Sequence, residues 1–118
     1  MTADDFREIV LGLDGASEGA HMKHPDFRVN GRIFSSLKPG GDEGVVKLSA
    51  DEQAELVRTQ PKTFAPAAGA WGRQGWTTLR LAGAKPAAVR GAVLLAWQGV
   101  LALPPTKPRT PRRRRPTS

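Results

Sequence analysis

The chain has 118 residues, no cysteine, and 18 lysines and arginines against 11 aspartates and glutamates, a formal net charge of +7. This length suits one domain of ordinary size and not two, and the lack of cysteine excludes disulfides, thiolate metal sites and a cysteine nucleophile. Residues 107–118 hold six cations and no acid, so residues 1–106 have 12 cations against 11 acids, a net charge of +1. We therefore expect a nearly neutral body followed by a basic segment.

The first predicted element is an amphipathic helix near the N-terminus. Its apolar residues recur at the spacing of one helix face, namely Phe6, Ile9, Val10 and Leu13. Thr2 is placed to cap the first turn, with Asp5 three residues later, as in a capping box. The helix should stop near Leu13, because residues 14–19 are polar and glycine-containing and predict a flexible passage.

A β-hairpin is predicted next. Residues 27–29 alternate apolar and charged side chains, and Asn30-Gly31 is the residue pair that tight hairpin turns prefer. A two-residue turn brings two pairs opposite each other, Val29 with Arg32 and Phe27 with Phe34. These four side chains should share one face of the sheet, with Phe27 and Phe34 in the core. Arg28 and Ile33 should lie on the other face.

The middle of the chain predicts a third strand and a second helix. Residues 39–44 are rich in turn formers and should join neighbouring strands, the second of which is the β-branched run 45–48. Ser49 and Glu52 form a second capping-box pattern. The helix that they begin should end before Pro61, because proline terminates helices.

The last predicted elements are a glycine-bent loop at residues 69–75, a strand at 76–81 and a closing helix. Alternation along the strand places Trp76, Thr78 and Arg80 on one face and Thr77, Leu79 and Leu81 on the other, which should be the core face. Pro86 suits the first turn of the closing helix, and Pro104-Pro105 ends its pattern.

These elements predict an α+β fold with an antiparallel sheet and helices packed on one face. The folded domain should span residues 1–103. Residues 104–118 replace apolar residues by proline, threonine and like charges, a composition that predicts a disordered basic tail.

Three segments together resemble one family of small bacterial proteins. HPDFRVNGRIF at 24–34, GVVKLS at 44–49 and AWGRQGWTTLRL at 70–81 are similar to the MmcQ/YjbR family, and the resemblance covers about residues 2–101. It implies a fold like that of the frataxin/CyaY proteins, in the arrangement described as double-wing, and a DNA-binding label that rests largely on that fold. Family members generally end soon after the last helix, so the basic tail departs from the pattern.

Nucleic-acid binding is the leading functional hypothesis, because cations can neutralise phosphate and flat rings can stack on bases. The protein is predicted to be non-enzymatic and cytoplasmic, and its binding weak and largely electrostatic. The candidate residues are Arg28, Arg32, Lys47, Trp71, Arg73, Trp76 and Arg80 in the body, with Lys107, Arg109, Arg112, Arg113, Arg114 and Arg115 in the tail. A structural role for the tryptophans is the plainer alternative, since tryptophan is highly buried on average.

A protein partner remains open for the same residues. A protein-interaction or adaptor module would use the Trp71–Trp76 loop against a partner's groove, because tryptophan and arginine lead interface hot spots. The tail would then be a solvated extension or a cloning remnant. A membrane is disfavoured, because residues 92–103 are too short to span a bilayer and would have to leave the core to lie on one.

No metal, cofactor or catalytic site is predicted. His21, His24 and Asp26 have ligand-type side chains, but two residues three apart in one strand point to opposite faces, and the chain has no further histidine. No serine-centred elbow or phosphate-binding glycine motif accompanies the histidines. The adjacent acids Asp42 and Glu43 should be solvated.

Overall fold

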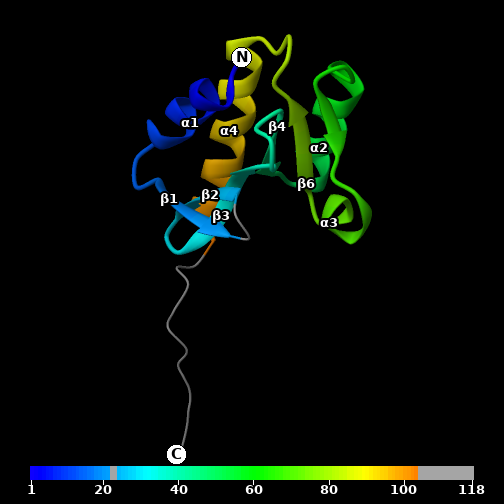
Figure 1. The fold of residues 1–118 in the computed structure, drawn as a ribbon. Coiled ribbons are helices and arrows are strands. Elements are labelled where there is room, and N and C mark those ends of the chain that lie inside the picture. Colours follow the sequence, from blue (N-terminus) through cyan, green and yellow to red (C-terminus); the bar gives the residue numbers. More distant parts are fainter. Residues whose placement is uncertain (22–23, 104–118) are drawn as a thin grey trace, which may run out of the picture.

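The computed structural model describes residues 1–21 and 24–103 (Figure 1). The elements follow one another as α1 (Ala3–Leu11), β1 (Ser17–His21), β2 (His24–Val29), β3 (Arg32–Leu37), β4 (Glu43–Lys47), α2 (Ala50–Thr59), β5 (Phe64–Pro66), α3 (Gly69–Arg73), β6 (Trp76–Arg80) and α4 (Pro86–Leu101). The predicted α+β fold class is confirmed. The predicted tail, residues 104–118, lies outside the described residues.

The six strands form one antiparallel sheet in the order β1-β2-β3-β4-β6-β5. Helix α4 crosses the middle of the molecule, with α1 on one side of it and α2 on the other (Figure 1). All three pack on the same face of the sheet. The ring of Phe6 in α1 lies directly over Gly44 in β4, and Gln53 in α2 donates to Thr77 Oγ1 on that face of β6.

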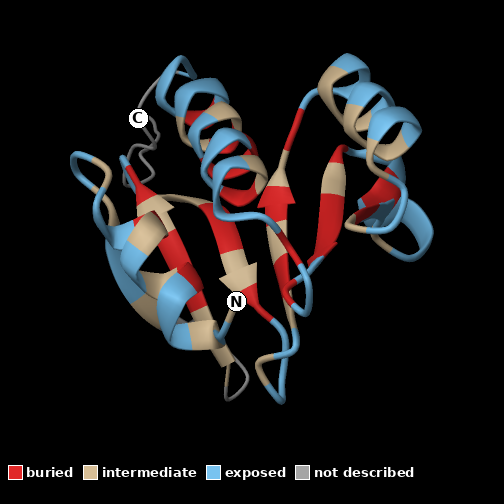
Figure 2. Ribbon diagram, turned by 90° about the horizontal axis from the view of Figure 1, so that it is seen from above, coloured by how far each residue is buried: buried red, intermediate tan, exposed pale blue. Residues whose placement is uncertain are grey.

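The core lies between this face and the helices, where buried residues line the strands and the inner side of α4 (Figure 2). Phe6 and Phe27 meet edge to face, with ring centroids 6.2 Å apart. The core positions predicted from alternation are confirmed, because Phe34, Leu79 and Leu81 are all buried.

Both predicted capping boxes are present and explain where α1 and α2 begin. The Thr2 hydroxyl accepts a hydrogen bond from the Asp5 amide, and the Ser49 hydroxyl accepts one from the Glu52 amide. In turn, the side-chain carboxylate of each acid accepts a hydrogen bond from the backbone amide of its cap residue.

Among the helices of the described ranges, none is long and apolar enough to cross a membrane.

Three elements were not predicted. The passage expected to be flexible, residues 14–19, overlaps β1, whose residues 17–21 pair along β2. The expected loop before Trp76 contains the one-turn helix α3, and the preceding residues 64–66 form β5 on the edge of β6. These elements are short, and the two strands exist through pairing with a neighbour, which composition alone does not reveal.

The predicted hairpin is present, but one of its pairings was wrong. Asn30 and Gly31 form the turn with φ of 53° and 77°, and Val29 pairs with Arg32 as predicted. Phe27 pairs with Ser35 and not with Phe34, because the register shifts by one residue at a β-bulge. The bulge lets Phe34 and Leu37 both enter the core, although they are three residues apart.

Gly44 provides a test of the packing between α1 and the sheet. A Cβ at this position would lie 2.8 Å from Phe6 Cζ, and the Phe6 ring is fully buried. We expect Gly44→Ala to lower the free energy of unfolding by about 1–3 kcal/mol, as overpacking does. Chemical denaturation followed by circular dichroism would measure it.

Gly91→Ala is the matched control, because a Cβ there meets nothing within 4 Å. Since alanine favours a helix over glycine by about 1 kcal/mol, this variant should be as stable as the parent or more so. Equal stability of the two variants would contradict the close packing of Phe6 on Gly44.

Candidate binding surface on the open face of the sheet

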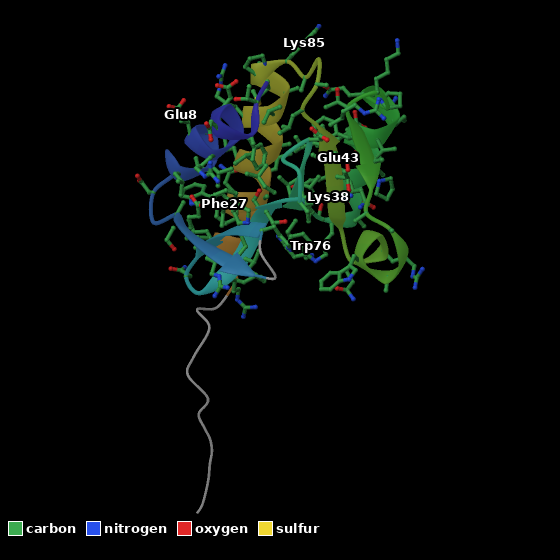
Figure 3. The ribbon with its side chains drawn as sticks, in the orientation of Figure 1. Glu8, Phe27, Lys38, Glu43, Trp76 and Lys85 are labelled. Atoms are coloured by element: carbon green, nitrogen blue, oxygen red, sulfur yellow. The ribbon has the colours of Figure 1, made fainter. Side chains whose placement is uncertain are left out.

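The face of the sheet opposite α1, α2 and α4 carries most of the candidate residues, and we call it the open face. Because side chains alternate along each strand, it is formed by Asp26, Arg28, Ile33, Ser36, Lys38, Val45, Lys47, Trp76, Thr78 and Arg80. Figure 3 shows Trp76 between the middle of the sheet and α3, with Lys38 close to it in that view. The predicted division of strand 76–81 into two faces agrees with this arrangement.

A cavity of about 480 Å³ lies on the open face, and we call it the Trp pocket. Its apolar lining comes from Ile33, Val45, Ala67, Ala68, Trp71 and Trp76. Its polar groups come from His24, Asp26, Ser36 and Lys38. Mostly apolar walls with a few polar groups are typical of ligand sites, and the volume falls within the range of about 300–1,000 Å³ usual for them.

Glycines and one glutamine hold the two tryptophans at this pocket. At Gly75, φ is +102° and an added Cβ would lie 1.9 Å from the Leu48 carbonyl oxygen, so only glycine fits the turn that leads into β6. The Gln53 amide donates to the carbonyl oxygens of Gly72 and Trp76, each at 3.0 Å. This ties α2 to both ends of the Trp71–Trp76 segment.

The two indoles are neighbours with different exposure. Their ring centroids are 6.1 Å apart and their planes make an angle of 72°, an edge-to-face contact. Trp76 is half-buried, whereas Trp71 is 62% exposed. Trp76 therefore belongs partly to the fold, and Trp71 presents a large apolar surface to solvent.

Arg28 has a structural role that the sequence did not reveal. Its Nε and Nη2 donate to the two carboxylate oxygens of Asp26 at 3.0 and 3.2 Å. Asp26 is buried and Arg28 is partly exposed. The hydrogen bonds and the negative charge of Asp26 raise the pKa of Arg28 above its ordinary value. Part of this guanidinium is thus committed to neutralising a buried acid.

Three predicted cations meet at a second cavity of about 630 Å³, which we call the cationic cavity. Arg28, Arg32 and Lys47 line it, together with Glu52 of α2 and with Gly99, Val100 and Leu103 at the end of α4. The cavity therefore lies at the edge of the sheet, between the open face and the C-terminal end of α4. Lys47 Nζ donates to the Gln74 carbonyl oxygen at 2.6 Å, which fixes the ammonium beside the C-terminal end of α3. Glu52 is engaged by its capping bond from the Ser49 amide.

The other predicted residues are apart from this group. Arg73 is exposed on α3, and Arg80 is exposed at the far end of β6, opposite Glu43 of β4. Glu43 also forms an ion pair with Lys38 at 3.1 Å, so it is not simply solvated as predicted. Lys107, Arg109, Arg112, Arg113, Arg114 and Arg115 lie outside the described residues.

The prediction that His21 and His24 lie in one strand, which was used against a metal site, was wrong. His21 and His24 are not in one strand; they are Cα partners across β1 and β2. Within residues 1–21 and 24–103, no three His, Cys, Asp or Glu residues gather as possible metal ligands. The sequence prediction also missed His24, Asp26, Ser36 and Lys38 as neighbours of the tryptophans, because that proximity depends on the register of β2, β3 and β4.

These features define a small α+β protein with one sheet face that α1, α2 and α4 do not cover and that bears two adjacent indoles. Residues 11–99 match the family model of YjbR, so the chain belongs to the YjbR family, as the three sequence segments predicted. The crystal structure of Deinococcus radiodurans protein DR2400, described with the family-model domain DUF419, is similar with a TM-score of 0.74 and 19% sequence identity. The likeness covers 86% of this chain and 79% of that chain and shows the fold. No curated protein matches the chain.

The ion pair of Arg28 with Asp26 predicts unequal effects of removing two arginines of the open face. Arg28→Met leaves a buried carboxylate without its bidentate partner, which is destabilising. We expect its Tm to fall by about 4 °C or more. Arg80→Met removes an exposed cation and should change the Tm by less than about 2 °C. Thermal unfolding at neutral pH would measure both, and equal shifts would show that the pair does not stabilise the fold.

Proposed function

We propose that this protein is a non-enzymatic module that binds nucleic acid weakly through the open face of its sheet. The observation that carries the proposal is the placement of Trp71 and Trp76 side by side on that face, next to the cavity lined by Arg28, Arg32 and Lys47. Aromatic rings offer stacking surfaces for bases, and a neighbouring positive groove attracts the phosphate backbone. This combination occurs in sheet surfaces that bind single-stranded nucleic acid.

The charge distribution predicts that binding by the body is modest. Residues 1–106 carry a net charge of only +1, and Arg28 is already engaged by Asp26. Arg32, Lys47, Arg73 and Arg80 add cations around the face, but long-range attraction from a nearly neutral body is small. The six cations of residues 107–118 would supply additional attraction that does not depend on sequence.

The proposal of a binding module and not an enzyme rests on the chemistry of the open face. Its most buried acid, Asp26, has both carboxylate oxygens bonded to Arg28. Because the guanidinium occupies both oxygens, Asp26 serves as the structural partner of Arg28. The stacking surface of Trp71 and the cations near it serve recognition more directly than bond cleavage.

A protein partner is the second candidate, and the exposure of Trp71 favours it. An indole that is 62% exposed above an apolar pocket resembles an interface anchor. In that case the Trp pocket would accept an apolar side chain, and the tail would have no part in binding. The two candidates differ in salt dependence, because an apolar contact changes little with ionic strength.

A salt titration of the full chain tests nucleic-acid binding. With labelled duplex DNA, six tail cations that release counterions predict a slope of log affinity against log salt of about −5, to which the open face adds little. A full-length variant with glutamine at Lys107, Arg109 and Arg112 through Arg115 should bind more weakly and show a much flatter slope. Fluorescence anisotropy at several salt concentrations would give both slopes.

The matched control replaces Lys62 and Lys85 with glutamine, because both are exposed and line neither the Trp pocket nor the cationic cavity. This control should keep nearly the full slope of the parent. Binding that is insensitive to salt in the parent protein, or absent at low salt, would contradict the proposal.

A further inference from the structure

The Trp pocket and the cationic cavity adjoin each other. Ile33 and Trp76 line both of them, so the two cavities form one continuous surface with Trp76 at the junction. At one end are the exposed ring of Trp71 and the apolar wall of Ala67 and Ala68. At the other end are the cations. A ligand that filled this surface would have a flat apolar part joined to an anionic part.

The Trp pocket suits a flat, partly polar ring. Trp71 and Trp76 meet edge to face, so the larger part of the Trp71 ring remains available for stacking. Lys38 and Ser36 place hydrogen-bonding groups at the polar side of the pocket. A nucleobase has this composition, with two apolar faces and a polar edge.

The cationic cavity suits a phosphate. Lys47 has three N–H donors and its bond to the Gln74 carbonyl uses one of them. Arg28 has five and its bonds to Asp26 use two, so both side chains keep donors. Half-buried Arg32 lines the same cavity. Glu52 also lines the cavity and would repel a phosphate, and the three cations outnumber this one acid.

We propose that the two cavities together take one unpaired nucleotide, with the base against Trp71 and Trp76 and the phosphate at Arg32 and Lys47. This inference rests on the proposed function and specifies its ligand. A base that is stacked and paired within a duplex cannot enter the Trp pocket without being extruded, which costs a few kcal/mol. The protein should therefore prefer single strands to duplexes of equal length.

The test compares an oligothymidylate with a hairpin duplex of the same number of phosphates, and with thymidine monophosphate, on the full chain. Trp71→Ala should weaken binding of the oligothymidylate about ten-fold, the loss expected for one stacked base. Binding of the duplex should change less than about two-fold. Trp71→Phe keeps a ring and should restore most of the affinity. Competition by the free monophosphate would show that a lone nucleotide suffices, whereas its failure to compete would assign the site to a nucleotide within a strand.

Arg32→Gln tests the phosphate end, with Arg90→Gln as its control because Arg90 is an exposed cation on α4, away from both cavities. Arg32→Gln should lower the affinity for the oligothymidylate more than Arg90→Gln does. Circular dichroism would confirm that each variant is folded.

The outcomes separate the two proposals. Equal affinity for single strand and duplex would overturn the nucleotide site, and so would unchanged binding of the oligothymidylate by Trp71→Ala. Salt-dependent binding of the duplex would still support the proposed nucleic-acid binding. If the full chain bound neither form at low salt, both proposals would be wrong.

Discussion

The packing of α1 on the middle of the sheet is the constraint on which the rest of the structure depends. The Phe6 ring occupies the space over Gly44 where any other residue would place a Cβ, and it meets Phe27 edge to face. This contact seats α1 beside α4, and α2 packs separately on the same face, where Gln53 donates to Thr77 Oγ1. Because side chains alternate along each strand, the opposite set of residues is then left uncovered by α1, α2 and α4. The open face is thus a consequence of where the core is.

A single β-bulge decides which residues occupy that face. Strict alternation from Ile33 would turn Ser35 and Leu37 outward and Ser36 and Lys38 inward. The extra residue at Phe34 reverses this, so that Leu37 is buried and Lys38 reaches the Trp pocket. Phe34 and Leu37 are three residues apart, whereas side chains on one face of a regular strand are two apart. The extra residue of the bulge places both on the same face. Two of the four polar residues of the Trp pocket, Ser36 and Lys38, therefore depend on one local irregularity.

The sequence predicted the elements that carry strong local signals. Both capping boxes, the Asn30-Gly31 turn and the proline-bounded α4 were identified because each depends on residues close in the chain. The segment around Trp71 was correctly singled out as surface, but α3, β1 and β5 were missed, since these short elements depend on their neighbours. For the site, the indoles and the cations were predicted individually. Their grouping into two joined cavities, and the engagement of Arg28 by Asp26, follow from the strand register and could not be derived from spacing along the chain.

The central claim is that nucleic acid binds at Trp71 and Trp76 on the open face, and the three tryptophans allow one direct measurement. Trp71 and Trp76 lie at the Trp pocket, whereas Trp97 is on α4 and its indole nitrogen donates to the Asp14 carbonyl oxygen at 2.9 Å. Titration of the ¹⁵N-labelled full chain with an oligothymidylate would follow the three indole N–H resonances by NMR. The account predicts that the Trp71 and Trp76 resonances shift together with a common saturation curve while Trp97 stays in place. A shift of Trp97 with Trp71 and Trp76 unmoved would contradict it.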